Sequence, residues 1–166
     1  MSLDEEVNRL QALLSREELP PDPKAYGLDQ FSAESKNELI KRLVRTLDPA
    51  PRGRLLARLG LIATDQNKAD MEQLFIANLR SPRPQARQIS LLGLAEMNYP
   101  NITDLAVLSL RDDSDQVLVT ACDLLLSKAK QDPRLWQFLK DVYTAHKDDP
   151  QFHMTKSFLE AHGVNQ

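Results

Sequence analysis

The sequence predicts an all-α protein in which helical hairpins stack as a repeat domain. Apolar residues recur at spacings of three and four, and no stretch alternates with period two over a useful length. The ten prolines gather between these periodic segments, while glycine is scarce, with five residues. A pattern of turn followed by helix also recurs after 31 residues. These observations favour a right-handed α–α superhelix, or solenoid, of about four helical hairpins with an N-terminal helical arm.

The arm is expected to be a helix over residues 3–17. Ser2 and Glu5 have the spacing of a capping box, in which each side chain satisfies a backbone amide of the other. The stretch 19–30 contains three prolines and one glycine, which predicts a linker. We therefore divide the chain into an N-terminal helix with a Pro-rich linker, residues 1–31, and a helical repeat domain, residues 32–166.

The later helices have clear start signals. Prolines 51, 84, 133 and 150 each open a periodic segment, where a missing N–H costs nothing. Asp132 and Asp149 add a side-chain cap just before two of these prolines. Short loops between helices of ten to fifteen residues predict antiparallel hairpins. The expected helices are 33–47, 51–63, 67–79, 84–97, 102–111, 115–129, 133–146 and 150–162.

The repeat is clearest in two segments, 79–93 and 110–124, which share a leucine, an arginine, a polar turn and a helix start. Stepping back 33 residues, Pro51-Arg52-Gly53-Arg54 matches Pro84-Gln85-Ala86-Arg87, and a weaker copy begins at Asp148. Over about residues 47–162 this pattern resembles HEAT repeats, in the short form of the phycobilisome-lyase-like group. Arg54 and Arg87 fall on the arginine position of that family, whereas Leu118 and His153 occupy it in the later copies and interrupt any arginine ladder.

The resemblance implies a concave face lined by the second helix of each hairpin. Solenoids of this kind mostly bind proteins, although some are enzymes or nucleic-acid readers. We therefore expect a non-catalytic adaptor or scaffold that binds another protein and needs no cofactor. The alternative is an enzyme subunit related to bilin lyases, or a chaperone for a carrier protein.

Composition sets further bounds. The chain has 166 residues, a formal net charge of -3 and a pI near 5.6. Its single cysteine excludes an internal disulfide and favours a reducing compartment. The acidic N-terminus lacks the pattern of a signal peptide, and no apolar run reaches the length of a membrane span. These features predict a cytoplasmic protein with no membrane partner.

No residue set predicts catalysis or metal binding. The three histidines, His146, His153 and His162, do not form a ligand motif, and Cys122 lies alone in an apolar helix, where it acts as a small buried hydrophobe. The run from Asp112 to Asp115 lacks the glycine and the glutamate of a calcium loop. We interpret it as a turn in which Ser114 caps the next helix and Asp115 lies favourably near the helix N-terminus.

Charge is unevenly distributed. Residues 36–87 carry 11 Lys and Arg against 5 Asp and Glu, while residues 1–35 carry 3 against 8. If the repeats stack, Arg54 and Arg87 form a basic strip that could hold an acidic partner or phosphates. The alternative, which we favour, is that these arginines bind turn carboxylates such as Asp48 or balance the acidic arm. The negative total charge and the 5% aromatic content argue against nucleic-acid binding and against a DNA-repair glycosylase.

The only tryptophan lies in the predicted helix 133–146. Trp136, Lys140 and Tyr143 share one face of that helix, and aromatic residues dominate binding hot spots. These three residues are candidate partner contacts. The alternative, which we prefer slightly, is that Trp136 packs under the last helix against Phe152 or Phe158.

The arm has two possible roles. Leu3, Val7, Leu10 and Leu14 form a seam of only two heptads, too short for a stable coiled coil alone. The arm either caps the first repeat, which we favour, or docks on another subunit to give a swapped homodimer through residues 3–14.

Overall fold

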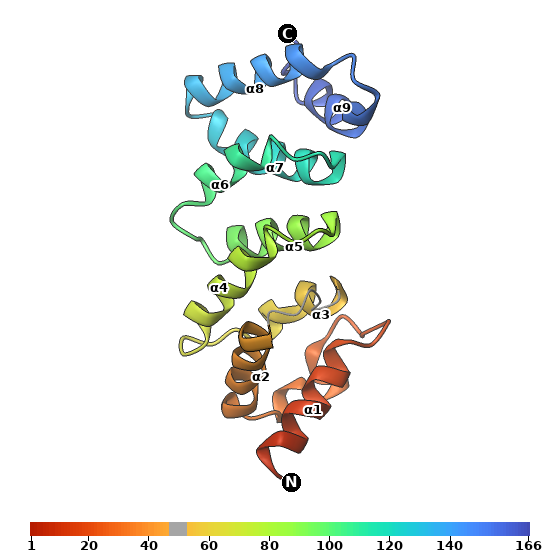
Figure 1. The fold of residues 1–166 in the computed structure, drawn as a ribbon, viewed down its shortest axis with the longest axis vertical. Coiled ribbons are helices and arrows are strands. Elements are labelled where there is room, and N and C mark those ends of the chain that lie inside the picture. Colours follow the sequence, from red (N-terminus) through yellow and green to blue (C-terminus); the bar gives the residue numbers. More distant parts are fainter. Residues whose placement is uncertain (47–52) are drawn as a thin grey trace. The chain divides into compact units, whose positions relative to one another are not determined.

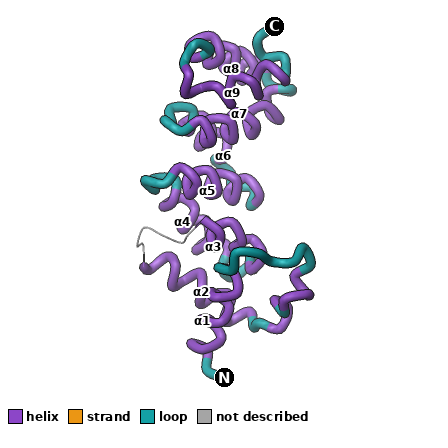
Figure 2. Tube along the Cα trace, turned by 90° about the vertical axis from the view of Figure 1, so that its right-hand side faces the viewer, coloured by secondary structure: helices purple, strands orange, loops and turns teal. Residues whose placement is uncertain are grey.

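A computed structural model describes residues 1–46 and 53–166. The described residues form α-helices joined by short loops and 3₁₀ turns, with no strand (Figure 2). The chain divides into two compact units, Met1–Ser81 and Pro82–Gln166. This division differs from the boundary predicted near residue 31, because the N-terminal helix packs on the helix that follows the linker.

The first unit contains four α-helices within the described residues (Figure 1). Helix α1 contacts α2 and α3, and α2 also contacts α4. Its core is built from leucine and isoleucine side chains of all four helices and of the 3₁₀ turn η3. The elements of this unit are α1 (Leu3–Leu14), η1 (Pro23–Tyr26), η2 (Leu28–Gln30), α2 (Ala33–Thr46), α3 (Gly53–Arg58), η3 (Leu59–Ile62) and α4 (Lys68–Asn78).

The arm is held to its own unit. The predicted capping box is present, since Ser2 accepts from the Glu5 amide and Glu5 accepts from the Ser2 amide. Val7, Leu10, Leu13 and Leu14 are buried, so the apolar seam of α1 is covered within the chain. The arm therefore packs on its own chain, as the favoured capping role requires, while the capping of a repeat and the homodimer through residues 3–14 stay predictions.

The second unit is organised around α7, which lies between α5 and α9 and also contacts α6 and α8 (Figure 1). Eight residues of α7 are buried, among them Ala121, Cys122 and Leu125, because small and branched side chains let several helices approach one axis. The elements of this unit are α5 (Pro84–Glu96), α6 (Ile102–Ser109), α7 (Asp115–Ala129), α8 (Pro133–His146), η4 (Pro150–Phe152) and α9 (His153–Ala161).

The predicted helices agree closely with the structure, and the differences lie at their ends. Helix α1 ends at Leu14 rather than at residue 17. Directly after Leu14, the Ser15 hydroxyl donates to the Gln11 carbonyl at 2.7 Å. The linker contains two 3₁₀ turns, and the helix predicted over 51–63 changes to a 3₁₀ turn after Arg58. The segment after Pro150 likewise starts as a 3₁₀ turn before α9. The predicted helix start at Pro51 lies outside the described residues.

Besides the Ser2 capping box, two of the three side-chain caps predicted for the later helices are confirmed. Asp132 accepts from the Arg134 amide at 3.0 Å, and Asp149 accepts from the Gln151 amide at 2.9 Å. The Ser114 prediction is wrong in its chemistry. Ser114 occupies the N-cap position of α7, but its side chain forms no cap bond, and its own amide donates to Asp112 Oδ1 at 2.9 Å.

Asp115 joins two helices of the second unit. It lies in the first turn of α7, as predicted, yet its carboxylate also accepts from the Met154 amide at 2.6 Å and the Thr155 amide at 2.9 Å. These amides belong to the first turn of α9. Amides in the first turn of a helix have no carbonyl acceptor within that helix. One carboxylate therefore satisfies orphan donors at the start of α9 from the start of α7.

Candidate functional site

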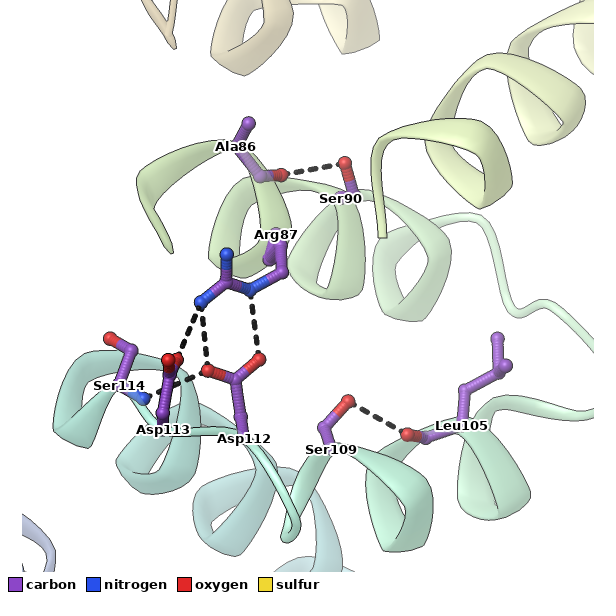
Figure 3. A network of polar contacts seen from close by, with 8 residues as sticks. All are labelled: Ala86, Arg87, Ser90, Leu105, Ser109, Asp112, Asp113 and Ser114. Atoms are coloured by element: carbon purple, nitrogen blue, oxygen red, sulfur yellow. Dashed lines mark hydrogen bonds and ion pairs between the residues drawn. The ribbon is translucent and has the colours of Figure 1, made fainter. Parts of the chain in front are cut away.

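Arg87 is held in an ion-pair network inside the second unit. Its Nε donates to Asp112 Oδ2 and its Nη2 to Asp112 Oδ1, both at 2.9 Å, and Nη2 also reaches Asp113 at 3.1 Å (Figure 3). The Arg87 side chain is 15% exposed and that of Asp112 13%. This bidentate pair joins α5 to the turn between α6 and α7. In Sequence analysis we favoured such a bond from an arginine to a turn carboxylate over a basic binding strip.

The pair also stabilises the ionised carboxylate. Burial by itself would raise the pKa of Asp112, but the hydrogen bonds from Arg87 and from the Ser114 amide outweigh it, so this pKa lies below its ordinary value. The pKa of Arg87 is raised, chiefly by its hydrogen bonds with Asp112. Both groups are therefore fully charged near neutral pH and engaged with each other.

Arginines of the first unit are turned toward the arm. Arg58 donates to the carbonyls of Leu14, the last residue of α1, and of Arg16 and Glu17, which follow it. Arg42 forms ion pairs with Asp4 of α1 and with Glu38. Arg54, a predicted contact residue, is 55% exposed and lies 4.0 Å from Glu17. The contact with Asp48 lies outside the described residues.

The face of α8 that carries Trp136, Lys140 and Tyr143 is half-buried at all three positions. The Tyr143 hydroxyl donates to Glu160 Oε1 of α9 at 2.7 Å. This hydrogen bond is the main reason that the pKa of Tyr143 is raised. The neighbouring face of α8 supplies Leu139, which is fully buried.

Within the described residues, the ring contacts pair the two phenylalanines named as alternative partners of Trp136 with histidines. Among the ring contacts of the described residues, Phe152 stacks with His146, with ring centroids 5.5 Å apart, and Phe158 stacks with His162 at 4.4 Å. Trp136 is half-buried, which is compatible with a surface anchor and with packing against the last helix. Its role in binding remains a prediction.

The structure places no metal-binding group among the described residues, where no three His, Cys, Asp or Glu side chains come together. Cys122 is buried in α7, and burial raises the pKa of its thiol to about 12. A thiol with that pKa is a poor nucleophile at neutral pH. In the part of the chain that the structure covers, no helix has the length and apolar character needed to cross a bilayer.

Two surface pockets lie within the second unit, and sequence reasoning predicted neither. The first, of about 280 Å³, lies between the α6–α7 turn and the start of η4. Its wall includes Asp112 and Asp149, but Asp112 is engaged by Arg87 and Asp149 caps η4. The polar wall of this pocket is therefore largely committed to holding the turns together.

The second pocket is a groove of about 380 Å³ between the α5–α6 connection and α7. Its lining is mainly apolar, with Tyr99 and Pro100 on one side and Leu124 on the other. Asn98, also in the lining, has φ of 54°, a left-handed conformation that asparagine adopts more readily than most residues. The Asn98-Tyr99-Pro100 sequence between two helices was the available signal for a tight turn, but it does not reveal a groove.

Comparisons with protein-family models, with curated proteins and with solved structures give no match to this chain. The candidate sites therefore depend on the geometry described above.

Proposed function

We propose that this chain is a non-catalytic adaptor or scaffold of the cytoplasm, built from HEAT-like hairpins in a right-handed solenoid, that binds another protein without a cofactor. The helix contacts within each unit support the repeat arrangement. In the second unit α7 contacts both α5 and α9, and in the first unit α2 contacts α4, so alternate helices pack on each other. Stacked hairpins produce this pattern, in which each repeat contacts its neighbours.

The binding surface that we propose is the face of α8 with Trp136, Lys140 and Tyr143. The observation that carries the proposal is that two aromatic side chains on one helix face are only half-buried, with one of them fixed by a hydrogen bond to Glu160. An aromatic group held in position loses little conformational entropy when it binds, and tyrosine and tryptophan are enriched in binding hot spots.

The electrostatic alternative uses Arg54 and Arg87. Arg87 is little exposed and already holds two carboxylates, so a partner would have to displace charge-assisted hydrogen bonds. Arg54 is more exposed and only distantly paired. The experiment must therefore separate the aromatic face from the basic residues.

The test is affinity capture from the source lysate with and without nuclease, using the wild-type chain, the Trp136→Ala/Tyr143→Ala double variant and a Gln137→Ala control on the exposed side of α8. We expect one stoichiometric protein that survives nuclease, is retained by the control and is lost with the double variant. Circular dichroism and thermal melting check that each variant folds.

Other outcomes would contradict the proposal. A partner that disappears with nuclease treatment would move the function to the basic residues. Co-purification of a pigment with visible absorbance would favour the bilin-lyase-like alternative. Capture that is unchanged by the double variant, with its fold intact, would remove the α8 face from the binding surface.

A further inference from the structure

The groove beside α7 has the size and the lining needed to hold an apolar side chain. Its volume of about 380 Å³ lies in the range of small ligand pockets, and its lining is mainly apolar. Ile102 and Ala106 come from α6, Leu124 comes from α7, and Tyr99 with Pro100 closes the side formed by the connection.

The connection that forms this wall is rigidly built. The Asn98 amide donates to the Ala95 carbonyl at 3.0 Å, and the Tyr99 amide donates to the Leu94 carbonyl at 3.0 Å. With Asn98 in the left-handed conformation, these bonds make a Schellman motif that ends α5. Pro100 follows directly and further restricts the backbone. The backbone at Tyr99 is therefore fixed before any ligand arrives.

The groove lining carries positive charge. Lys128 is the only charged side chain among the described residues that line it. Its ammonium donates to Thr103 Oγ1 at 2.6 Å and, within the described chain, forms no ion pair. An ammonium has three donors, so two remain for a ligand. The Tyr99 hydroxyl also has no hydrogen-bond partner among the described residues and offers a further donor at the same groove.

We infer that this groove binds a segment of a partner protein that presents an apolar side chain beside a carboxylate. The apolar side chain would fill the space between Tyr99 and Leu124, and the carboxylate would pair with Lys128. A basic segment is disfavoured because it would bring a second cation to Lys128 with no carboxylate in the groove lining to compensate.

This inference assumes that the chain binds protein, as the proposed function does, but it uses none of the α8 residues. An experiment can therefore distinguish failure of the groove inference from failure of the proposed α8 binding surface. A Trp136→Ala variant should keep the groove interaction, whereas changes at Lys128 should leave the α8 face intact.

The experiment uses the ¹⁵N-labelled full chain and two capped hexapeptides with a central leucine–phenylalanine pair, one flanked by four glutamates and the other by four lysines. Titration followed by amide chemical shifts should map the glutamate peptide to Tyr99, Thr103 and Ser127. We expect it to bind at least ~10-fold more tightly than the lysine peptide, the size of effect that one charge-assisted contact provides.

Variants separate a specific contact from general attraction. Lys128→Glu should reverse the preference between the peptides. Lys130→Glu, an exposed lysine outside the groove lining on the same end of α7, should change affinity by less than about two-fold. Ser127→Trp, which adds bulk at the groove, should abolish binding while Lys128 is intact.

Absence of shifts at the groove, equal affinity for both peptides, or an equal effect of Lys128→Glu and Lys130→Glu would each overturn the inference. The amide spectrum of each variant reports in the same experiment whether it is folded. If a variant is not folded, the comparison of the two peptides on the wild-type chain still decides the outcome.

Discussion

At the scale of single residues, arginines act mainly as connectors between segments. Arg87 joins α5 to the α6–α7 turn, and Arg58 joins the end of α3 to the carbonyls that follow α1. The planar guanidinium, with five donors, can satisfy several acceptors at once, which a lysine cannot do in the same geometry. Of these two residues, Arg87 was a candidate for the basic strip, and its contacts join two segments of its own unit.

Replacement of Arg87 should be costly. Arg87→Ala leaves the little-exposed Asp112 without its main partner, so we expect a loss of about 2–3 kcal/mol in the free energy of unfolding. Arg87→Lys should recover only part of the free energy of unfolding lost in Arg87→Ala, because lysine cannot form the bidentate pair. Urea denaturation measures both. Arg111→Ala, an exposed control nearby, should stay within about 0.5 kcal/mol, and an equal loss there would show that the pair is unimportant.

The same pair predicts a response to acid. The pKa of Asp112 is lower in the folded chain than its ordinary value of 3.8. The stabilisation from this group is therefore complete above that value and is lost as the pH falls through the folded pKa. The difference in stability between wild type and Asp112→Asn should be constant near neutral pH and shrink below about pH 4. Urea unfolding across pH 2.5–7 tests this, and a difference independent of pH would contradict it.

At the scale of elements, helix ends are satisfied by side chains from other helices. Asp115 of α7 accepts from amides at the start of α9, and Glu6 of α1 accepts from the Ser32 amide at 2.8 Å just before α2. The bond from Ser32 is the main reason that the pKa of Glu6 is lowered. Each such contact fixes the position of one helix relative to another and adds to the apolar packing between them.

The arm should loosen when its C-terminal contact is removed. Arg58→Ala leaves the carbonyls of Leu14, Arg16 and Glu17 without this donor. We therefore expect hydrogen exchange of α1 amides to accelerate by about ten-fold, the equivalent of about 1.4 kcal/mol in local opening. Mass spectrometry of deuterated peptides measures it. Lys41→Ala, an exposed change on α2, serves as the control, and unchanged exchange in α1 would show that apolar packing alone holds the arm.

At the scale of the whole molecule, the described chain comprises two units, each with its own buried core. The single cysteine lies in the core of the second unit, within the helix that contacts four others. Its thiol is shielded by burial and has a pKa of about 12. Cys122 is therefore a natural reporter of opening in residues 82–166.

Labelling of Cys122 by a thiol reagent should be slow under native conditions and should become fast on unfolding. Leu125→Ala, which truncates a fully buried side chain of the same helix, should destabilise the second unit by about 2–5 kcal/mol and accelerate labelling. Asp123→Ala, at an exposed position of α7, should leave the rate nearly unchanged. Rapid labelling of the native wild-type chain would show that the thiol is accessible.

The helical elements of this protein could be predicted from local sequence patterns. Apolar spacing marked the helices, and prolines with preceding aspartates marked several starts, because these signals act through local backbone geometry and nearby amides. The capping box at Ser2 and the buried environment of Cys122 could be predicted for the same reason. Helix ends were less accurate at Leu14, whose carbonyl accepts a hydrogen bond from Arg58, a residue distant in sequence.

The partners of the polar groups, in contrast, are set by how the helices pack. The pairing of Arg87 with Asp112, the second role of Asp115 at α9 and the groove between Tyr99 and Leu124 each join residues about 25 to 40 positions apart. Local sequence patterns do not indicate which residues this far apart in sequence come into contact. These contacts form only when the helices pack against each other. The candidate partner face of α8 could be predicted from helical spacing, whereas its half-buried state depends on how α7 and α9 cover that helix.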